Sequence, residues 1–166
     1  LIRTGENLGF AAACNRGAAT GTAPFLLFLN PDTRLYTNSL LVPLAFMGKS
    51  ESQDVGICGI QLVDENGRVS RTCARFPALR HLVVGALGIE KLPCFRGAGM
   101  QMSEWCHDQT RVVDQVMGAF FLIRRELFEQ LRGFDEQFFV YFEEVELSFR
   151  ARQTGWRSVY LAEARA

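Results

Sequence analysis

An unbroken apolar run, "FLLFL" at positions 25–29, constrains the fold of this chain more than any other feature. A strand without a polar position is typical of a sheet that is covered on both faces, because a sheet with one wet face alternates apolar and polar residues. Residues 7–21 and 37–48 read as helices, and residues 55–60 form a second short apolar strand. Strands that alternate with helices predict an α/β fold, with a mostly parallel sheet flanked by helices.

The second half of the chain continues this alternation. Residues 62–69 contain Asn-Gly between β-compatible flanks, which predicts a hairpin. Residues 112–116 and 119–123 are predicted strands, and a short helix is expected at 125–131.

Two segments of the second half are harder to interpret. Residues 93–109 show no periodicity and are predicted to form a loop. Residues 145–152 alternate between apolar and polar side chains, as a strand would. We favour a helix there, because Glu146 and Arg150 form an i,i+4 pair, Gly155 suits a helix C-cap, and a helix buried on two sides shows the same alternation.

Composition excludes several classes of function. Eighteen basic and eighteen acidic residues cancel, which disfavours nucleic-acid binding through net charge. No apolar stretch approaches the roughly 20 residues that span a bilayer. Five cysteines without a CxxC pair predict reduced thiols in a cytoplasmic protein. Cys106-His107 is interpreted as a buried thiol rather than a zinc site, since His81 is the only other histidine.

The apolar run at 25–29 ends in Asn30-Pro31-Asp32. Ligands of open α/β sheets lie beyond the carboxyl ends of the strands, and Pro31 restricts the backbone that carries Asp32. A carboxylate in that position suits Mg²⁺ or Mn²⁺. The alternative is an ordinary turn, which these residue types also favour and which is the better reading of this motif alone.

The stretch "GENLGFAAACNRG" at 5–17 runs from a glycine-containing loop into a helix. Such a helix start offers free backbone N–H groups to a phosphate or a polar ring. It lacks the GxGxxG and Walker patterns, so a plain helix N-terminus explains it equally well.

The stretch "GFDEQFFVYFEEVELSFR" at 133–150 places five acids among six aromatic residues. Apolar surroundings disfavour the charged form of a carboxylate, which makes it a better base near neutral pH. The adjacent Glu143 and Glu144 cannot both face one site. The alternative, a solvated acidic helix start, fits poorly with so many aromatic neighbours.

In this order, "NLGFAAACNRG", "LFLNPDT" and "VMGAFFLIRRELFEQLRGFDEQFFVYFEEVELSFRARQTGW" closely resemble family 2 glycosyltransferases, especially the bacterial rhamnosyltransferase-like branch. The resemblance covers nearly the whole chain. It implies a GT-A fold, a Rossmann-like sheet that binds a nucleotide sugar. The chain begins at Leu1 without a methionine, so we expect residues 1–166 to be a single domain, an incomplete segment of a longer protein that lacks the family's first strand.

On the donor side, the resemblance implies that Asn30-Pro31-Asp32 is the metal and diphosphate motif, with Asp32 as the ligand of Mg²⁺ or Mn²⁺. It also implies that Asn7, Gly9 and Asn15 lie near the nucleotide.

Towards the reacting sugar, Gly118 and Ala119 match the floor of the sugar pocket. Glu143 and Glu144 match the family's Glu-Asp pair, whose second member is the expected catalytic base. Glu144 stands where Asp is usual and Glu146 where a second Asp is common. Glu is a competent base, but it is one methylene longer.

The resemblance implies inverting, metal-dependent transfer of a sugar, with rhamnose as the first choice, from a dTDP- or UDP-sugar to a glycan or lipid-linked acceptor in polysaccharide biosynthesis. We expect a cytoplasmic protein, peripheral at the inner membrane. The alternatives are a non-catalytic glycan- or partner-binding module derived from a transferase, and a nucleotidyltransferase, which releases pyrophosphate.

Overall fold

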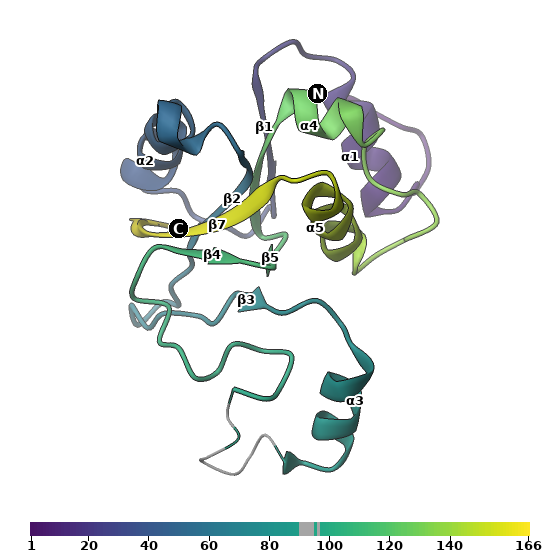
Figure 1. The fold of residues 1–166 in the computed structure, drawn as a ribbon. Coiled ribbons are helices and arrows are strands. Elements are labelled where there is room, and N and C mark those ends of the chain that lie inside the picture. Colours follow the sequence, from purple (N-terminus) through teal and green to yellow (C-terminus); the bar gives the residue numbers. More distant parts are fainter. Residues whose placement is uncertain (90–94, 96) are drawn as a thin grey trace.

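A five-stranded sheet forms the centre of the computed structural model, which describes residues 1–89, 95 and 97–166 (Figure 1). The strands follow one another across the sheet as β1 (Phe25–Leu29), β6 (Phe120–Arg124), β2 (Val55–Gln61), β7 (Arg157–Arg165) and β4 (Arg111–Val113).

The sheet is mixed. Strands β1, β2 and β7 run in one direction, as expected, but β6 and β4 run against them. Only β2 and β7 therefore form a parallel pair, and the other neighbouring pairs are antiparallel. The predicted α/β class is confirmed, but fewer neighbouring strands are parallel than the alternation of strands and helices predicted.

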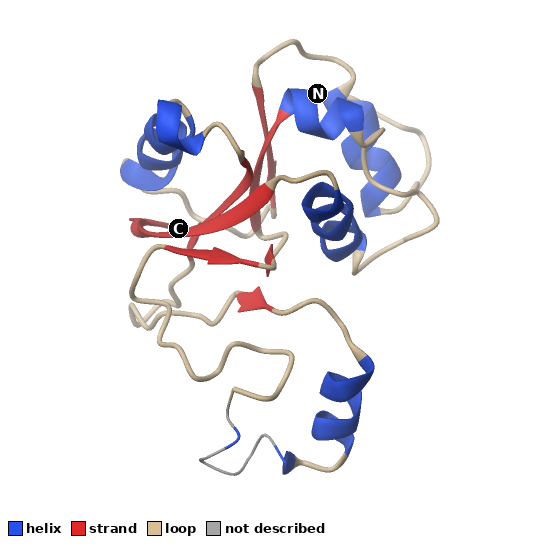
Figure 2. Ribbon diagram, in the orientation of Figure 1, coloured by secondary structure: helices blue, strands red, loops and turns tan. Residues whose placement is uncertain are grey.

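Helices cover both faces of the sheet (Figure 2). On one face lie α1 (Phe10–Ala18), α4 (Arg125–Gln130) and α5 (Glu143–Gln153), and on the other lies α2 (Asn38–Met47). The predicted helices at 7–21, 37–48 and 125–131 are thus confirmed, within shorter bounds.

Successive residues of the strands belong to two separate cores. In β6, Phe121 and Ile123 pack under α1, α4 and α5, whereas Phe120 and Leu122 pack under α2. Strand β1 divides in the same way, with Phe28 in the first core. Each fully buried side chain of this size contributes roughly 1.5–3 kcal/mol. Burial on both faces is the reason that these strands carry no polar position.

A smaller layer extends one end of the sheet. Strand β3 (Cys73–Ala74) pairs with β5 (Gln115–Val116), and β3 leads into α3 (Leu79–Ala86), which the sequence pattern did not predict. The predicted hairpin at 62–69 is confirmed by a bridge between Val63 and Val69 and by the positive φ of 75° at Gly67. Of the predicted loop at 93–109, residues 93, 94 and 96 lie outside the described residues, and the rest contains no α-helix and only one β-bridge, to Ala74.

The stretch at 145–152 is helical, as favoured. Arg150 binds Glu146 through both of its oxygens, at 2.5 and 2.6 Å, and also donates to the carbonyl of Gly133 at 2.9 Å. Leu147 and Ala151 enter the core beneath the sheet, while Phe149 lies on the outer side of the helix. Two apolar faces on one helix account for the alternation that imitates a strand.

The Cys106-His107 pair differs from its interpretation as a buried thiol, because Cys106 is exposed and His107 is fully buried. The His107 ring stacks on Trp105 with centroids 4.1 Å apart. Its Nε2 accepts the backbone N–H of Cys73 at 3.2 Å, so Nδ1 carries the hydrogen that faces the Trp105 carbonyl. Both nitrogens are used by the neutral ring, which suits a structural histidine.

Stability is expected to decline in acid because of His107. Burial, with a smaller effect of the nearby Arg71 and Arg111, lowers the pKa of His107 below its usual value of 6.5. As the pH falls through 6.5, the unfolded chain therefore binds a proton at this histidine more readily than the folded protein does. The contribution of the neutral ring to the free energy of unfolding is fully present above pH 6.5 and is lost as the pH falls below it. Urea unfolding between about pH 7.5 and 5 checks this. The stability difference between wild type and His107→Gln should shrink towards the acid end, and a constant difference would contradict the prediction.

The described residues include no helix that combines the length and the hydropathy of a membrane span.

Candidate functional site

The turn after β1 is fixed against the start of β6. The backbone N–H of Asn30 donates to the carbonyl of Ala119 at 3.1 Å, and the hydroxyl of Thr33 donates to the same oxygen at 3.3 Å. Between these two anchors, Asp32 is exposed, and its carboxylate has no hydrogen bond or ion pair with any described residue. An anchored loop thus presents an unpaired carboxylate at the carboxyl end of a strand.

A cavity of about 710 Å³ opens beside Asp32. Its other walls come from the hairpin that follows β2 and from the end of the chain; the lining residues are Asp32, Thr33, Arg34, Tyr36, Leu62, Val63, Asp64, Glu65, Gly67, Ser70 and Ala166. This volume lies within the range of roughly 300–1,000 Å³ found for small-molecule sites. The sequence predicted the hairpin but gave no signal that it faces Asp32.

Glu144 contacts the segment that anchors this loop. A Cβ atom built on Gly118 would lie 3.6 Å from Oε1 of Glu144, so the carboxylate packs against the bare backbone of Gly118. The adjacent Ala119 accepts the N–H of Asn30 and so holds the loop of Asp32. The structure thus links Asn30, Gly118, Ala119 and Glu144 through one segment, whereas the residues that line the cavity beside Asp32 do not include Gly118, Ala119 or Glu144.

The two adjacent glutamates face different surroundings. Glu143 is buried beside Cys14 of α1, whereas Glu144 is partly exposed. Oε2 of each is buried without a hydrogen-bond partner among the described residues. Burial raises the pKa of Glu143, and the neighbouring charge of Glu144 adds to the effect.

Cys14 is not suited to act as a nucleophile. Burial, together with the charge of Glu143, raises the pKa of its thiol to about 12. A thiol with such a pKa is protonated at neutral pH and therefore unreactive.

The loop that enters α1 is packed against the loop between α4 and α5. The side-chain oxygen of Asn7 accepts the N–H of Gly9 at 3.0 Å. The N–H of Phe10 donates to the carbonyl of Phe139 at 2.9 Å, and a Cβ atom on Gly9 would lie only 2.6 Å from that oxygen. This close approach requires glycine at position 9, which also has a positive φ of 79°.

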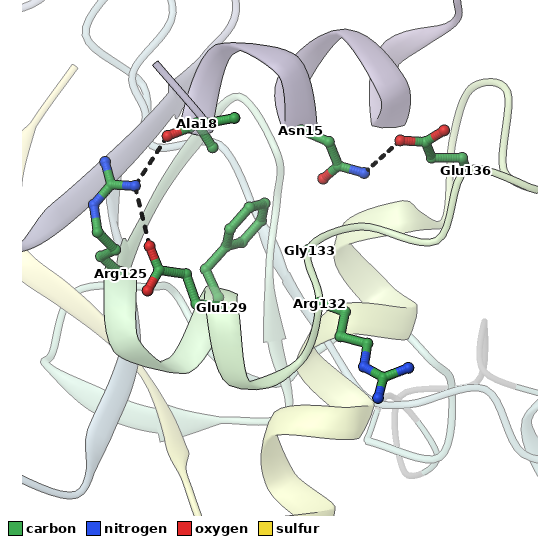
Figure 3. A pocket seen from close by; sticks show the side chains of 9 residues that line it. Asn15, Ala18, Arg125, Glu129, Arg132, Gly133 and Glu136 are labelled. Carbon is green, nitrogen blue, oxygen red and sulfur yellow. Dashed lines mark hydrogen bonds and ion pairs between the residues drawn. The ribbon is translucent and has the colours of Figure 1, made fainter. Parts of the chain in front are cut away.

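Asn15 makes a second tether between these elements. Its Nδ2 donates to the carbonyl of Phe134 at 2.9 Å, and its Oδ1 accepts the N–H of the same residue at 2.9 Å. Nδ2 also donates to Glu136 at 3.0 Å, and the two side chains point towards one another in the lining of a cavity of about 430 Å³ (Figure 3). A Cβ atom on Gly133 would lie 2.5 Å from Oδ1. The amide of Asn15 is thus occupied by protein backbone.

Loss of this tether is expected to reduce stability. Asn15→Ala leaves both backbone groups of Phe134 without their partner, and each unsatisfied buried group costs about 1–3 kcal/mol. Thermal unfolding should show a lower melting temperature by several degrees. The matched control is Asn66→Ala, in an exposed turn, which should change the melting temperature little. Equal melting temperatures of Asn15→Ala and wild type would contradict the role of a tether.

The carboxylate of Asp32 is the group of this site that could bind a divalent cation. The described residues contain no group of three or more His, Cys, Asp or Glu side chains that could enclose a metal. Asp32 is an unpaired carboxylate beside an open cavity that Asp64 and Glu65 also line, an arrangement that suits Mg²⁺ or Mn²⁺ when phosphate oxygens and water complete the coordination.

Comparison with known proteins gives concordant matches. A family model described as "Glycosyltransferase like family 2" matches residues 3–166. An N-acetylglucosaminyl-diphospho-decaprenol L-rhamnosyltransferase of Mycobacterium tuberculosis is 30% identical over an alignment that covers 99% of this chain and 56% of that protein. Rhamnosyltransferase WbbL of Escherichia coli is 29% identical over 140 residues, which cover 82% of this chain and 49% of that protein.

The fold also matches a solved structure. GalNAc-T7, crystallised with UDP, GalNAc and Mn²⁺, superposes with a TM-score of 0.66 at 16% identity, over 99% of this chain and 30% of that one. The chain therefore has the fold of that enzyme's matched portion. It spans about half the length of the two rhamnosyltransferases.

Proposed function

Since this chain belongs to glycosyltransferase family 2 and is a glycosyltransferase, we propose that the cavity beside Asp32 binds a nucleoside-diphosphate sugar and that Glu144 acts as the catalytic base. One observation carries this proposal. The segment Gly118-Ala119 contacts the Glu144 carboxylate through Gly118 and holds the loop of Asp32 through Ala119. A sugar bound at this segment would lie near both the proposed base and the proposed diphosphate site.

The proposed reaction is an inverting displacement. The acceptor hydroxyl attacks the anomeric carbon and forms the new glycosidic bond, while the bond between that carbon and the diphosphate oxygen breaks. Glu144 takes the hydroxyl proton. The nucleoside diphosphate leaves with the electron pair of the broken bond. A divalent cation held by Asp32 would supply positive charge to the diphosphate.

The names of the similar proteins support a specific donor and acceptor for this chain. Two of them are named rhamnosyltransferases, and the name of the mycobacterial protein specifies a lipid-linked sugar diphosphate as its acceptor. For this chain we propose a dTDP- or UDP-linked sugar, with rhamnose first, as the donor, and a lipid-linked or glycan hydroxyl as the acceptor. Work on such an acceptor would place the protein on the cytoplasmic side of the inner membrane.

Product analysis tests the proposal. The purified protein is incubated with Mn²⁺, a panel of dTDP- and UDP-sugars and acceptor sugars, and the released nucleotide is identified by mass spectrometry. Release of nucleoside diphosphate with a new glycoside is expected. Release of pyrophosphate would indicate a nucleotidyltransferase, and failure to bind any nucleotide or metal would indicate a non-catalytic binding module.

A further inference from the structure

An apolar groove of about 290 Å³ lies along the outer face of α5. Its walls are the segment that enters α3, the loop before α5 and α5 itself; the lining residues are Phe76, Pro77, Phe138, Phe142, Val145, Glu146 and Phe149. Phe76 and Phe149 meet edge to face with ring centroids 5.2 Å apart. The groove is thus built almost entirely from aromatic and aliphatic side chains.

The groove carries no uncompensated charge. Glu146 is its one charged lining residue, and both of its carboxylate oxygens are bound by Arg150. A phosphate or a glycan would find no free donor in this ion pair. An uncharged hydrocarbon is the complementary occupant.

Apolar side chains next to the groove are held outward at a conformational cost. Tyr141 and Phe142 both have a positive φ, of 70° and 71°, which is rare for bulky residues. Their side chains are nevertheless 75% and 53% exposed, so burial in the described chain does not offset the strain. Strain of this kind gathers at ligand-binding sites, and exposed apolar patches mark surfaces that bind something.

Helix α3, which begins two residues after Pro77, also carries exposed apolar side chains. Leu79, Val83 and Leu87 are four residues apart, lie on one side of that helix or at its end, and are all exposed.

Both walls of the groove are connected along the chain to the proposed reaction centre. Phe142 and Val145 flank Glu143 and Glu144 in the chain, although Glu144 lies on the opposite, core-facing side of α5, against Gly118. On the other wall, Phe76 donates its N–H to Asp114 at 3.0 Å, immediately before strand β5, and β5 ends two residues before Gly118. A molecule with its reactive end at Glu144 would therefore reach the groove by passing around the first turn of α5.

We propose that this groove binds the hydrocarbon chain of a lipid-linked acceptor, in the part of the chain nearest the sugar. The proposal rests on the proposed function and adds to it a binding surface for the lipid part of the acceptor. The groove is at the lower limit of ligand-pocket volumes, so it would hold a portion of a long chain and leave the rest free.

Two synthetic acceptors test this proposal, N-acetylglucosaminyl diphosphate linked to a long polyprenyl chain and the same head group linked to a methyl group. Phe149→Glu places a charge in the groove. It should raise KM for the long-chain acceptor by about tenfold, the order expected when burial of an apolar group is lost, and leave KM for the methyl acceptor unchanged. Phe149→Leu should behave as wild type. Leu41→Glu, an equally drastic change on exposed α2, should alter neither value.

Equal effects of Phe149→Glu on both acceptors, or no effect on either, would overturn the proposal. Direct binding of the long-chain probe, measured by fluorescence without donor, separates this inference from the proposed function. Wild type should bind the probe and Phe149→Glu should bind it about tenfold more weakly, even if transfer is never observed. Equal binding by both proteins, or no binding by wild type, would refute the proposal that the groove binds the hydrocarbon chain. Light scattering that showed a dimer dissociated by Phe149→Glu would assign the surface to a second copy instead.

Discussion

Glu144→Gln is expected to reduce sugar transfer by about 10²–10⁴-fold, the usual contribution of a general base, while donor binding stays close to that of wild type. Glutamine keeps the length of the side chain and its contact with Gly118, but it cannot take a proton from the acceptor hydroxyl. The measurement is the initial rate of nucleoside diphosphate release in the presence of acceptor, alongside calorimetric titration of the nucleotide.

The matched control for this variant is Glu51→Gln, which removes an exposed carboxylate from a surface ion pair and should leave the rate unchanged. Transfer by Glu144→Gln at the rate of wild type would remove Glu144 from the role of base. Loss of nucleotide binding together with transfer would instead indicate damage to the whole site.

Asp32→Asn should weaken metal-dependent nucleotide binding by at least about tenfold and lower transfer in proportion. The carboxylate has no partner among the described residues, and the loop is held by Asn30 and Thr33, so the variant should fold normally. Titration of UDP or dTDP with and without Mn²⁺ measures the effect. Wild type should bind the nucleotide more tightly with the metal, and Asp32→Asn should show little difference between the two conditions.

Asp108→Asn, at an exposed position away from the cavity, serves as the control. Metal-dependent binding by Asp32→Asn equal to that of wild type would exclude Asp32 as the ligand of the cation.

The sequence predicted those parts of the fold in which local pattern and burial agree. The run at 25–29 is an edge strand whose residues pack against the cores on both faces of the sheet. The ambiguous stretch at 145–152 is a helix, as its i,i+4 ion pair and glycine cap, both local signals, indicated. Strand direction was harder to predict. The residues of β6 are apolar whichever way the strand runs, so nothing in them indicates that it enters the sheet antiparallel to both neighbours.

The sequence could predict which residues form the candidate site, but not how these residues are arranged in space. Motif resemblance pointed to Asp32, Gly118 and Glu144, and only the folded chain brings them to one segment. Asn15 illustrates the limit of sequence reasoning. The resemblance implies that Asn15 lies near the nucleotide, which stays a prediction, but no sequence pattern indicated that both ends of its amide pair with the backbone of Phe134, 119 residues away in the chain.

The double attachment of the α4–α5 loop to α1 has a mechanical consequence. Phe134 is hydrogen-bonded to Asn15, and Phe139 is hydrogen-bonded to Phe10. Three residues, 140–142, remain between Phe139 and the helix that carries Glu144. Two of them, Tyr141 and Phe142, already occupy an uncommon backbone conformation. Apart from rotation within the Glu144 side chain, any movement of this carboxylate relative to α1 therefore depends on a short segment that ends at the aromatic groove.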